Sequence, residues 1–460
     1  MSKAKTGTGP DDRGMTGPEM MRRTKALADE ERRRERAGKV LEGPPMRRPL
    51  DPTIEERIQQ KRDVSEELQY NMSKGVPTTP KSVAWNLAHI LTRDPWYRSR
   101  LCLNSLSEQV EWEAAPVRDE VMTDIQVKIY DDYGVEFSFA AIDRGVKAAG
   151  LKLKYHPVRE YLNSLEWDGV QRIDHFLSRY LGVEDTALHR AISMRWLVSC
   201  VARGMSGGEK PVKVDTVLIL VGKQGKRKST CFRYLVGDRW FSDTKFDLRN
   251  KDSLMSIRGK WIYEIAELDS TRQREQTTVK AFLSAVTDNF RPPYARNNID
   301  SHRQVVFVGT TNEQSFLVDQ TGDRRYWPVQ IGDGEIRLDD IRRDRDQIWA
   351  EAVRAYRGGV EWWLSPEEDA ELVSAQEIFR HEDPWQVTIE GWLSDPVNVA
   401  KANRGLRLGQ LLTEAIGMDA EKQGKQHEMR IGGLLQGLGW GKRRVVVAGN
   451  RHTRWFPPSP

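Results

Sequence analysis

The pattern of hydrophobic and polar positions changes several times along the chain, and each change predicts a different kind of element. From residue 83, the stretch "VAWNLAHILTRDPWYRSRLCLNSLS" places apolar residues at helical spacing. The Asp94–Pro95 pair predicts the end of that helix, because a residue before proline avoids helical backbone angles. Helical patterns with one short strand continue to Arg203. We therefore expect a compact, mostly helical N-terminal domain over residues 75–203.

The centre of the chain shows short apolar runs that alternate with helical patterns. The runs are "VDTVLILVG", "KWIYEIAEL" and "RQVVFVGTTN". Strands and helices in alternation are typical of a parallel α/β sheet. This pattern predicts an α/β core over residues 204–335, with a helical extension over residues 336–383.

The two ends of the chain differ from this centre. Residues 1–74 are charge-dense and offer little apolar surface, so we interpret them as a disordered charged arm. Residues 384–460 show helical patterns and then a basic hairpin, which is the element order of a winged-helix-like domain.

Composition narrows the class of protein. A chain of 460 residues, with 38% hydrophobic and 30% charged residues, predicts several globular domains. No apolar stretch is long enough to span a membrane, and the N-terminus lacks the apolar core of a secretory signal. The three scattered cysteines, Cys102, Cys200 and Cys231, argue against a disulfide framework and a zinc site. A reducing cytoplasm is therefore the expected location.

The stretch "VLILVGKQGKRKST" has the parts of a phosphate-binding loop. Such a loop needs a strand, a glycine-rich turn whose N–H groups face phosphate, a lysine, a hydroxyl for Mg²⁺ and a following helix. Lys228 is the predicted phosphate lysine and Ser229 the predicted metal hydroxyl. A surface loop rich in lysine is the alternative. The predicted nucleotide-binding residues are Gly222, Gln224, Gly225, Lys226, Arg227, Lys228, Ser229 and Thr230.

Arg227 is a departure from this pattern, which has glycine at that position. If the position needs a positive φ, a side chain costs roughly 1 to 2 kcal/mol. That cost would weaken binding about tenfold without abolishing it. Alternatively, the arginine supplies charge to a phosphate.

Acidic and polar residues follow the next two predicted strands. Glu264 is the candidate for the metal-linked acid, and Glu267 for the residue that activates water. Asn312 fits a sensor that orients this water. Arg324 and Arg325 lie in a polar turn from which an arginine can reach a phosphate of the neighbouring subunit. Solvated acids and a surface arginine pair are the plainer interpretations. We expect all these groups to share one triphosphate.

The order of these motifs carries a family resemblance. "GKQGKRKST", "WIYEIAEL", "FRPPYARN", "VVFVGTTN" and "GDRRYWPV", preceded by "YHPVREYLNSLEWDGVQRIDHF", resemble the virulence-associated protein E (VapE) family over residues 85–329. The ATPase core of that family is similar to superfamily III helicases of the AAA+ class. The resemblance implies Lys228 and Ser229 as Walker A, Glu264 and Glu267 as Walker B, Asn312 as sensor 1, and Arg324 or Arg325 as the arginine finger. It also implies ATP, Mg²⁺ and a homo-oligomeric, hexameric ring.

Two stretches are candidates for contact with DNA. Between the second and third strands, Arg291, Tyr294 and Arg296 combine cations with a stacking side chain. In the C-terminal hairpin, Lys442, Arg443 and Arg444 form a cationic cluster on the predicted wing. Packing of either stretch onto a core is the alternative.

These features leave two main functions open. One is an ATP-dependent helicase or replication initiator of a prophage or mobile element, acting on single-stranded or forked DNA. The other is a nucleotide-gated DNA-binding switch with weak or no hydrolysis. A small-molecule kinase is a third, weaker reading, because no lid for an acceptor substrate is evident.

Overall fold

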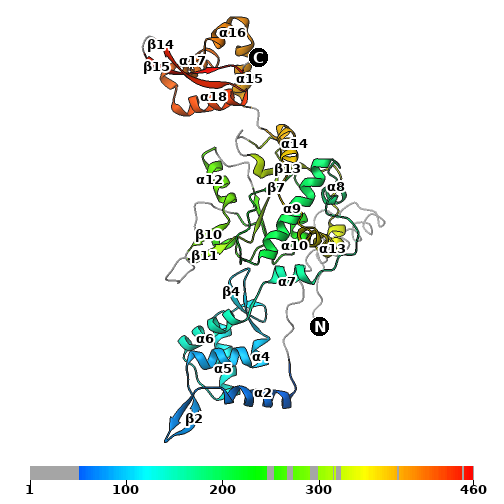
Figure 1. Ribbon diagram of the computed structural model, residues 1–460, viewed down its shortest axis with the longest axis vertical. Helices are drawn as coiled ribbons and strands as arrows, with labels where there is room; N and C mark the ends of the chain where they lie inside the picture. Colours follow the sequence, from blue (N-terminus) through cyan, green and yellow to red (C-terminus); the bar gives the residue numbers. More distant parts are fainter. Residues whose placement is uncertain are drawn as a thin grey trace, which may run out of the picture.

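A computed structural model describes residues 51–245, 253–266, 273–290, 299–313, 315–317, 323–380, 383–447 and 450–458. An N-terminal, a central and a C-terminal unit follow one another along the long axis of the molecule (Figure 1). The N-terminal and C-terminal units each have one cluster of buried apolar side chains, and the central unit has two, one on each face of its sheet. In the part of the chain described, no helix combines the length and apolarity needed to cross a bilayer.

The N-terminal unit begins earlier than the sequence predicted. A helix forms from Ile54 to Glu66, inside the expected disordered arm, because Thr53 and Glu56 close a capping box at its start. Val64 and Leu68 then bury their side chains in the N-terminal cluster. The prediction of disorder is therefore wrong for this part of residues 1–74, while residues 1–50 lie outside the described residues.

Short strands were the main feature of this unit that the sequence did not reveal. Helix α3 ends at Arg93 and α4 begins at Pro95, which confirms the predicted break. A four-stranded sheet of order β5-β4-β3-β6 packs beside the helices, and its strands of two to four residues are too short to show alternation. The elements are α2 (Ile54–Glu66), β1 (Tyr70–Ser73), β2 (Val76–Pro80), α3 (Ala84–Arg93), α4 (Pro95–Arg98), β3 (Leu101–Asn104), β4 (Gln109–Trp112), β5 (Ala115–Pro116), α5 (Asp119–Tyr133), α6 (Phe139–Lys152) and β6 (Lys154–Tyr155).

A parallel sheet of order β13-β7-β12-β9-β8 forms the middle of the central unit. The three predicted strands correspond to β7 (Val217–Val221), β9 (Ile262–Ala266) and β12 (Val306–Thr311), which confirms the mixed α/β class. Alternate residues of β7 enter different clusters, so Leu218 and Leu220 face one layer of helices while Ile219 faces the other. The two edge strands, β8 (Phe241–Ser242) and β13 (Tyr326–Gln330), were not predicted. Strand β13 contains Pro328, which an edge strand tolerates.

Helices cover both faces of this sheet (Figure 1). Apolar side chains of α9, α10 and α13 share one cluster with one face, and those of α12 pack on the other. The helices are α7 (Pro157–Ser164), α8 (Phe176–Leu181), α9 (Ala187–Ser206), α10 (Lys228–Val236), α11 (Ser253–Ser256), α12 (Gln273–Ser284), α13 (Leu338–Arg357) and α14 (Pro366–Gln376), and the hairpin strands are β10 (Thr287–Phe290) and β11 (Ile299–His302).

The boundary predicted at residue 203 is wrong. Helices α7, α8 and α9 were assigned to the N-terminal domain, yet their buried side chains belong to the cluster on the central sheet. Trp196 of α9 contacts Phe232 of α10 with ring centroids 5.6 Å apart. The helical pattern of α9 shows an apolar face but not which unit that face packs against.

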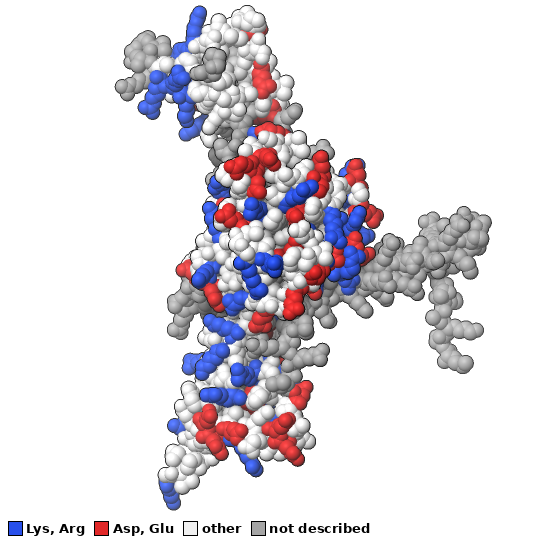
Figure 2. Space-filling model, turned by 45° about the vertical axis from the view of Figure 1, so that its right-hand side comes forward, with Lys and Arg blue, Asp and Glu red and all other residues white. Residues whose placement is uncertain are grey.

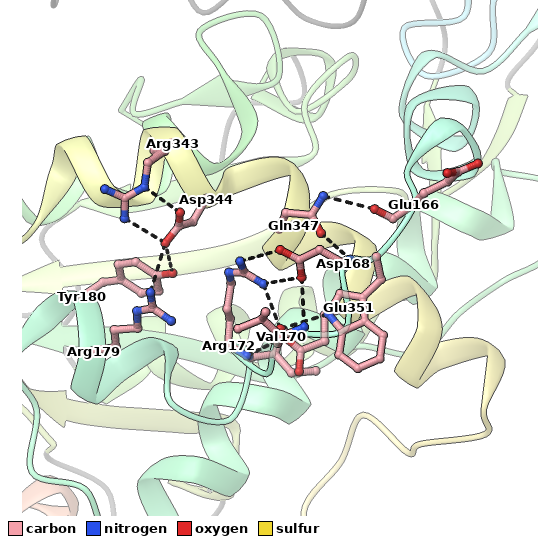
Figure 3. A network of polar contacts seen from close by, with 12 residues as sticks. Glu166, Asp168, Val170, Arg172, Arg179, Tyr180, Arg343, Asp344, Gln347 and Glu351 are labelled. Atoms are coloured by element: carbon pink, nitrogen blue, oxygen red, sulfur yellow. Dashed lines mark hydrogen bonds and ion pairs between the residues drawn. The ribbon is translucent and has the colours of Figure 1, made fainter.

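A polar network fastens the segment between α7 and α8 onto α13 (Figure 3). The Glu351 carboxylate accepts hydrogen bonds from the backbone N–H groups of Arg172 (2.6 Å) and Ile173 (3.1 Å). Its burial raises the pKa of Glu351, and the two N–H groups oppose this shift. The Gln347 side chain accepts a hydrogen bond from the backbone N–H of Asp168 and donates one to the Glu166 carbonyl. This network orients α13 against the sheet.

His156 lies in the chain between β6 of the N-terminal unit and α7 of the central unit. We expect its buried side chain to make the stability of the protein depend on pH. Its Nδ1 accepts the N–H of Arg159 (3.0 Å), so Nε2 carries the hydrogen that is donated to Gln304 Oε1 (2.5 Å). Burial lowers the pKa of His156 to about 4. Between about pH 6.5 and pH 4, His156 is protonated in the unfolded chain but not in the folded one. The free energy of unfolding therefore falls as the pH falls through this range, by roughly 2 to 3 kcal/mol. Urea unfolding across this pH range measures the effect.

His156→Asn is the matched variant for this measurement, because asparagine retains a cap for α7 but does not titrate. We expect its unfolding free energy to change less between pH 6.5 and pH 4 than that of the wild type. Equal slopes in the two proteins would show that His156 does not carry the effect.

The C-terminal unit consists of four helices and a two-stranded antiparallel hairpin. Ile389, Leu411 and Ile431 are buried in its cluster together with Trp455 of the hairpin. The elements are α15 (Pro384–Ser394), α16 (Pro396–Asn403), α17 (Leu408–Glu414), α18 (Lys425–Gly437), β14 (Gly441–Val447) and β15 (Asn450–Phe456).

Candidate functional site

The loop from β7 to α10 lies at the carboxyl end of its strand and turns sharply into the helix. Gly225 has a φ of 84° and Arg227 a φ of 59°. Position 227 thus meets the condition of a positive φ, which for an arginine costs about 1 kcal/mol. A Cβ at Gly222 would lie 2.5 Å from Cγ1 of Ile331, so glycine is required there for close packing. The loop therefore leads directly to the N-terminus of α10, where backbone N–H groups can face an anion.

Lys228 is the first residue of α10, and its side chain folds back over the loop. Its Nζ donates to the carbonyls of Gly222 (2.5 Å) and Lys223 (3.1 Å) and to Asn312 Oδ1 (2.9 Å). Burial lowers the pKa of Lys228, and the nearby Glu264 carboxylate opposes this shift. A phosphate bound here would take the place of these oxygen partners.

Glu264 on β9 is 2% exposed and lies beside the loop. Its Oε1 accepts hydrogen bonds from Ser229 Oγ (2.8 Å) and Thr310 Oγ1 (2.5 Å). Its Oε2 is buried and has no hydrogen-bond partner among the residues that the structure describes. A buried carboxylate oxygen without a partner is costly, and a bound cation would satisfy it. The Ser229 hydroxyl and the Glu264 carboxylate are oxygen ligands that suit Mg²⁺.

The order of the strands explains why these groups meet. Strand β12 lies between β7 and β9, so Asn312, just after β12, and Glu264 on β9 both lie close to the loop after β7. The prediction that Glu264 ends its strand is wrong, because β9 continues to Ala266 and Glu264 pairs with Val308 in mid-strand. The structure brings together Lys228, Ser229, Glu264 and Asn312, whose catalytic roles stay predictions.

Two contacts at this site were missed by sequence reasoning. Thr310 bonds Glu264, and the signal for it was a polar residue within an otherwise apolar strand. Lys226 Nζ bonds the carbonyls of Asp333 and Gly334, in a segment far along the chain for which the sequence held no signal.

Residues 162–381 match the family model described as the virulence-associated protein E-like domain. We refer to this matched segment as the VapE-like domain. Among curated proteins, none matches the chain. Three solved structures of the NrS-1 C-terminal region, all described as apo, resemble it at 11%, 13% and 13% identity and TM-scores of 0.44, 0.44 and 0.42. Each match covers 78% of the present chain and 96% of the NrS-1 chain.

The VapE-like domain also contains the predicted arginine turn. That turn lies at the amino ends of the parallel strands, opposite the carboxyl ends where the phosphate loop lies. Arg325 precedes β13, whose first residue pairs with Val217 at the start of β7. Because β7 and β13 are parallel and five residues long, the arginines lie roughly 16 Å from the phosphate-loop edge. Within a single chain, the arginines therefore lie too far from Lys228 to share its triphosphate, and the expected meeting of all groups needs an arginine from another subunit. Contact from a neighbouring subunit stays a prediction.

The two arginines of this turn have different surroundings. Arg325 Nε donates to Ser284 Oγ (3.0 Å) and lies 3.8 Å from Asp215 Oδ2. Arg324 is exposed. Of the pair, Arg324 presents its guanidinium to the outside of the VapE-like domain.

Several predicted residues fall elsewhere. Glu267, Arg291, Tyr294 and Arg296 lie outside the described residues. Gln224 is exposed in the loop and Thr230 is half-buried on α10. Lys442, Arg443 and Arg444 are exposed on β14, beyond the VapE-like domain.

Proposed function

We propose that this chain is an ATP-dependent DNA helicase or replication initiator of a prophage or mobile genetic element, which hydrolyses ATP with Mg²⁺ at the subunit interfaces of a ring. The observation that carries the proposal is the meeting of Lys228, Ser229, Glu264 and Asn312 at one edge of a parallel sheet. A phosphate-binding loop, a buried acid and a strand-end amide in this arrangement suit hydrolysis of a nucleoside triphosphate.

Each group has a distinct part in the proposed reaction. The N–H groups at the start of α10 and the Lys228 ammonium bind the β- and γ-phosphates. Mg²⁺ held by Ser229 and Glu264 would neutralise charge on these phosphates. The Asn312 amide, once Lys228 has turned to phosphate, is free to orient the attacking water. An exposed arginine of the next subunit, Arg324, would stabilise the charge of the transition state.

The hairpin of the C-terminal unit supports binding to DNA. Lys and Arg side chains gather at one side of this unit (Figure 2). In the register of the hairpin, Arg443 lies opposite Arg454 and Arg444 lies opposite Thr453. Like charges directly opposite each other repel, and Arg454 donates to the carbonyls of Arg404 (3.2 Å) and Gly405 (3.3 Å), so the exposed Arg443 is the one of the pair more open to an external anion. The phosphate backbone of DNA is such an anion, and contact with it carries no sequence preference.

The test uses the full-length chain and measures ATP hydrolysis with and without single-stranded DNA, unwinding of a forked duplex, and nucleotide-dependent assembly by analytical ultracentrifugation. We expect stimulation by DNA and strand separation. Replacing Lys442, Arg443 and Arg444 by alanine should weaken DNA binding about tenfold or more. The slope of the logarithm of the binding constant against the logarithm of the salt concentration should become shallower by roughly two to three. Lys401→Ala with Lys422→Ala is the surface control, since both lysines pair with acids in the same unit.

One observation favours the second function, a nucleotide-gated DNA-binding switch. The phosphate-loop lysine is engaged by three oxygen atoms, and Arg227 occupies a strained position beside it. Both features would slow turnover. DNA binding that requires ATP, without hydrolysis above background and without unwinding, would favour the switch over the helicase.

A further inference from the structure

Three consecutive cations, at the end of the loop and the first position of α10, differ in what they contact. Lys226 Nζ is bound by the carbonyls of Asp333 and Gly334. Lys228 Nζ is bound by two loop carbonyls and Asn312. The side chain of Arg227 is exposed and makes neither a hydrogen bond nor an ion pair with any residue in the described ranges, while its backbone carbonyl accepts the N–H of Cys231 (3.2 Å). Of the three, it alone has a cationic group uncommitted to the protein there.

The backbone at Arg227 is unfavourable for an arginine. It is the N-cap of α10, with φ 59° and ψ 33°, in the left-handed region that glycine and asparagine tolerate best. Its side chain makes no capping hydrogen bond. The arginine therefore adds strain to the loop and, among the described residues, no contact that would offset it. Strain of this kind is typical of residues that are held in place for a ligand.

The surroundings indicate which ligand this is. On one side of the loop, α10 begins with N–H groups and Lys228, which attract anions. On the other side, the buried Glu264 has an oxygen without a partner among the described residues, which attracts a cation. A nucleoside triphosphate with its divalent cation satisfies both.

We propose that Arg227 is a phosphate ligand of this site, whose guanidinium binds the triphosphate beside Lys228. This inference rests on the proposed function and adds to it a residue that the phosphate-loop pattern does not contain. With arginine in place of glycine at position 227, the backbone there is strained, and the loop carries an additional positive charge. Because ATP carries one more negative charge than ADP, such a residue also increases the preference for ATP.

Strain and charge make opposite predictions for substitutions at position 227. Arg227→Gly and Arg227→Asn both relieve the strain and both remove the charge. Arg227→Lys keeps the strain and the charge. If Arg227 binds phosphate, the first two variants weaken Mg-ATP binding about tenfold or more, while Arg227→Lys stays within about threefold of the wild type. If Arg227 is only a strained surface residue, Gly and Asn tighten binding or leave it unchanged.

The experiment titrates Mg-ATP and Mg-ADP into the full-length chain and each variant, with heat of binding as the readout. We expect the ratio of ADP to ATP dissociation constants to fall in Arg227→Gly and Arg227→Asn. Thermal unfolding without nucleotide is the folding control, and these two variants should be at least as stable as the wild type because the strain is gone. Tighter or unchanged ATP binding in both variants overturns the inference.

Wild-type binding and Lys228→Ala separate this inference from the proposed function. If the wild type binds Mg-ATP, Lys228→Ala does not, and Arg227→Gly binds as well as the wild type, the inference fails and the nucleotide site stands. If the wild type binds no Mg-ATP, both are wrong.

Discussion

Replacing Lys228 by alanine is expected to lower ATP binding and hydrolysis by about a hundredfold or more, because its buried ammonium lies beside Asn312 at the start of α10, where the phosphates would bind. The measurement is steady-state phosphate release together with titration of Mg-ATP. In the absence of nucleotide, the variant also leaves Asn312 Oδ1 and two loop carbonyls without this donor. Its thermal stability therefore has to be measured in parallel.

Lys210→Ala is the matched control, since this exposed lysine lies in the segment before β7 and away from the loop. We expect its hydrolysis rate to stay close to that of the wild type. Hydrolysis that persists in Lys228→Ala, in a folded protein, would mean that the loop after β7 does not bind the triphosphate.

The second large effect concerns the arginine turn. Arg324→Ala is expected to lower hydrolysis by about a thousandfold, because an arginine finger stabilises the charge of phosphoryl transfer. Since the turn lies at the far edge of the sheet from Lys228, the loss should be repaired by a neighbouring subunit. Mixing Arg324→Ala chains with Glu264→Gln chains should restore roughly a quarter of the wild-type rate, the share of interfaces that pair an intact acid with an intact arginine in a randomly mixed ring.

Arg325→Ala is the comparison within the same turn. Arg325 is engaged by Ser284 and Asp215, so it holds the turn in place rather than pointing outward. We expect a smaller loss of hydrolysis in Arg325→Ala than in Arg324→Ala. If no mixture recovers hydrolysis, the site is completed within one chain. The proposal of hydrolysis at the subunit interfaces of a ring would then be wrong.

The local parts of the site were predictable because each depends on a short segment. The apolar run before Gly222, the lysine and hydroxyl after it, and the acid in the strand of Glu264 are patterns of a few residues. The same pattern raised a positive φ at Arg227 as a condition, and the structure shows that φ. Local backbone geometry is set by neighbours in sequence, and these are visible in the chain itself.

Contacts between distant segments could not be predicted in this way. The link from Lys226 to Asp333 and Gly334 and the bond from Thr310 to Glu264 join segments that only the packed sheet brings together. Helix α9 was assigned to the wrong unit for the same reason, because an apolar helix face does not identify its partner. Strand β13 was not predicted, and its Pro328 is tolerated because the fold puts that strand at an edge.

By itself, the sequence determined the parallel α/β class, the three inner strands and the phosphate-type loop with Lys228 and Ser229, since periodicity and turn chemistry act over a few residues. Only the tertiary structure decided that β12 lies between β7 and β9, which brings Glu264 and Asn312 to Lys228, and that β13 lies beside β7 with its arginines at the other edge. The order of strands in a sheet depends on how whole layers bury their apolar faces, and no single segment carries that information.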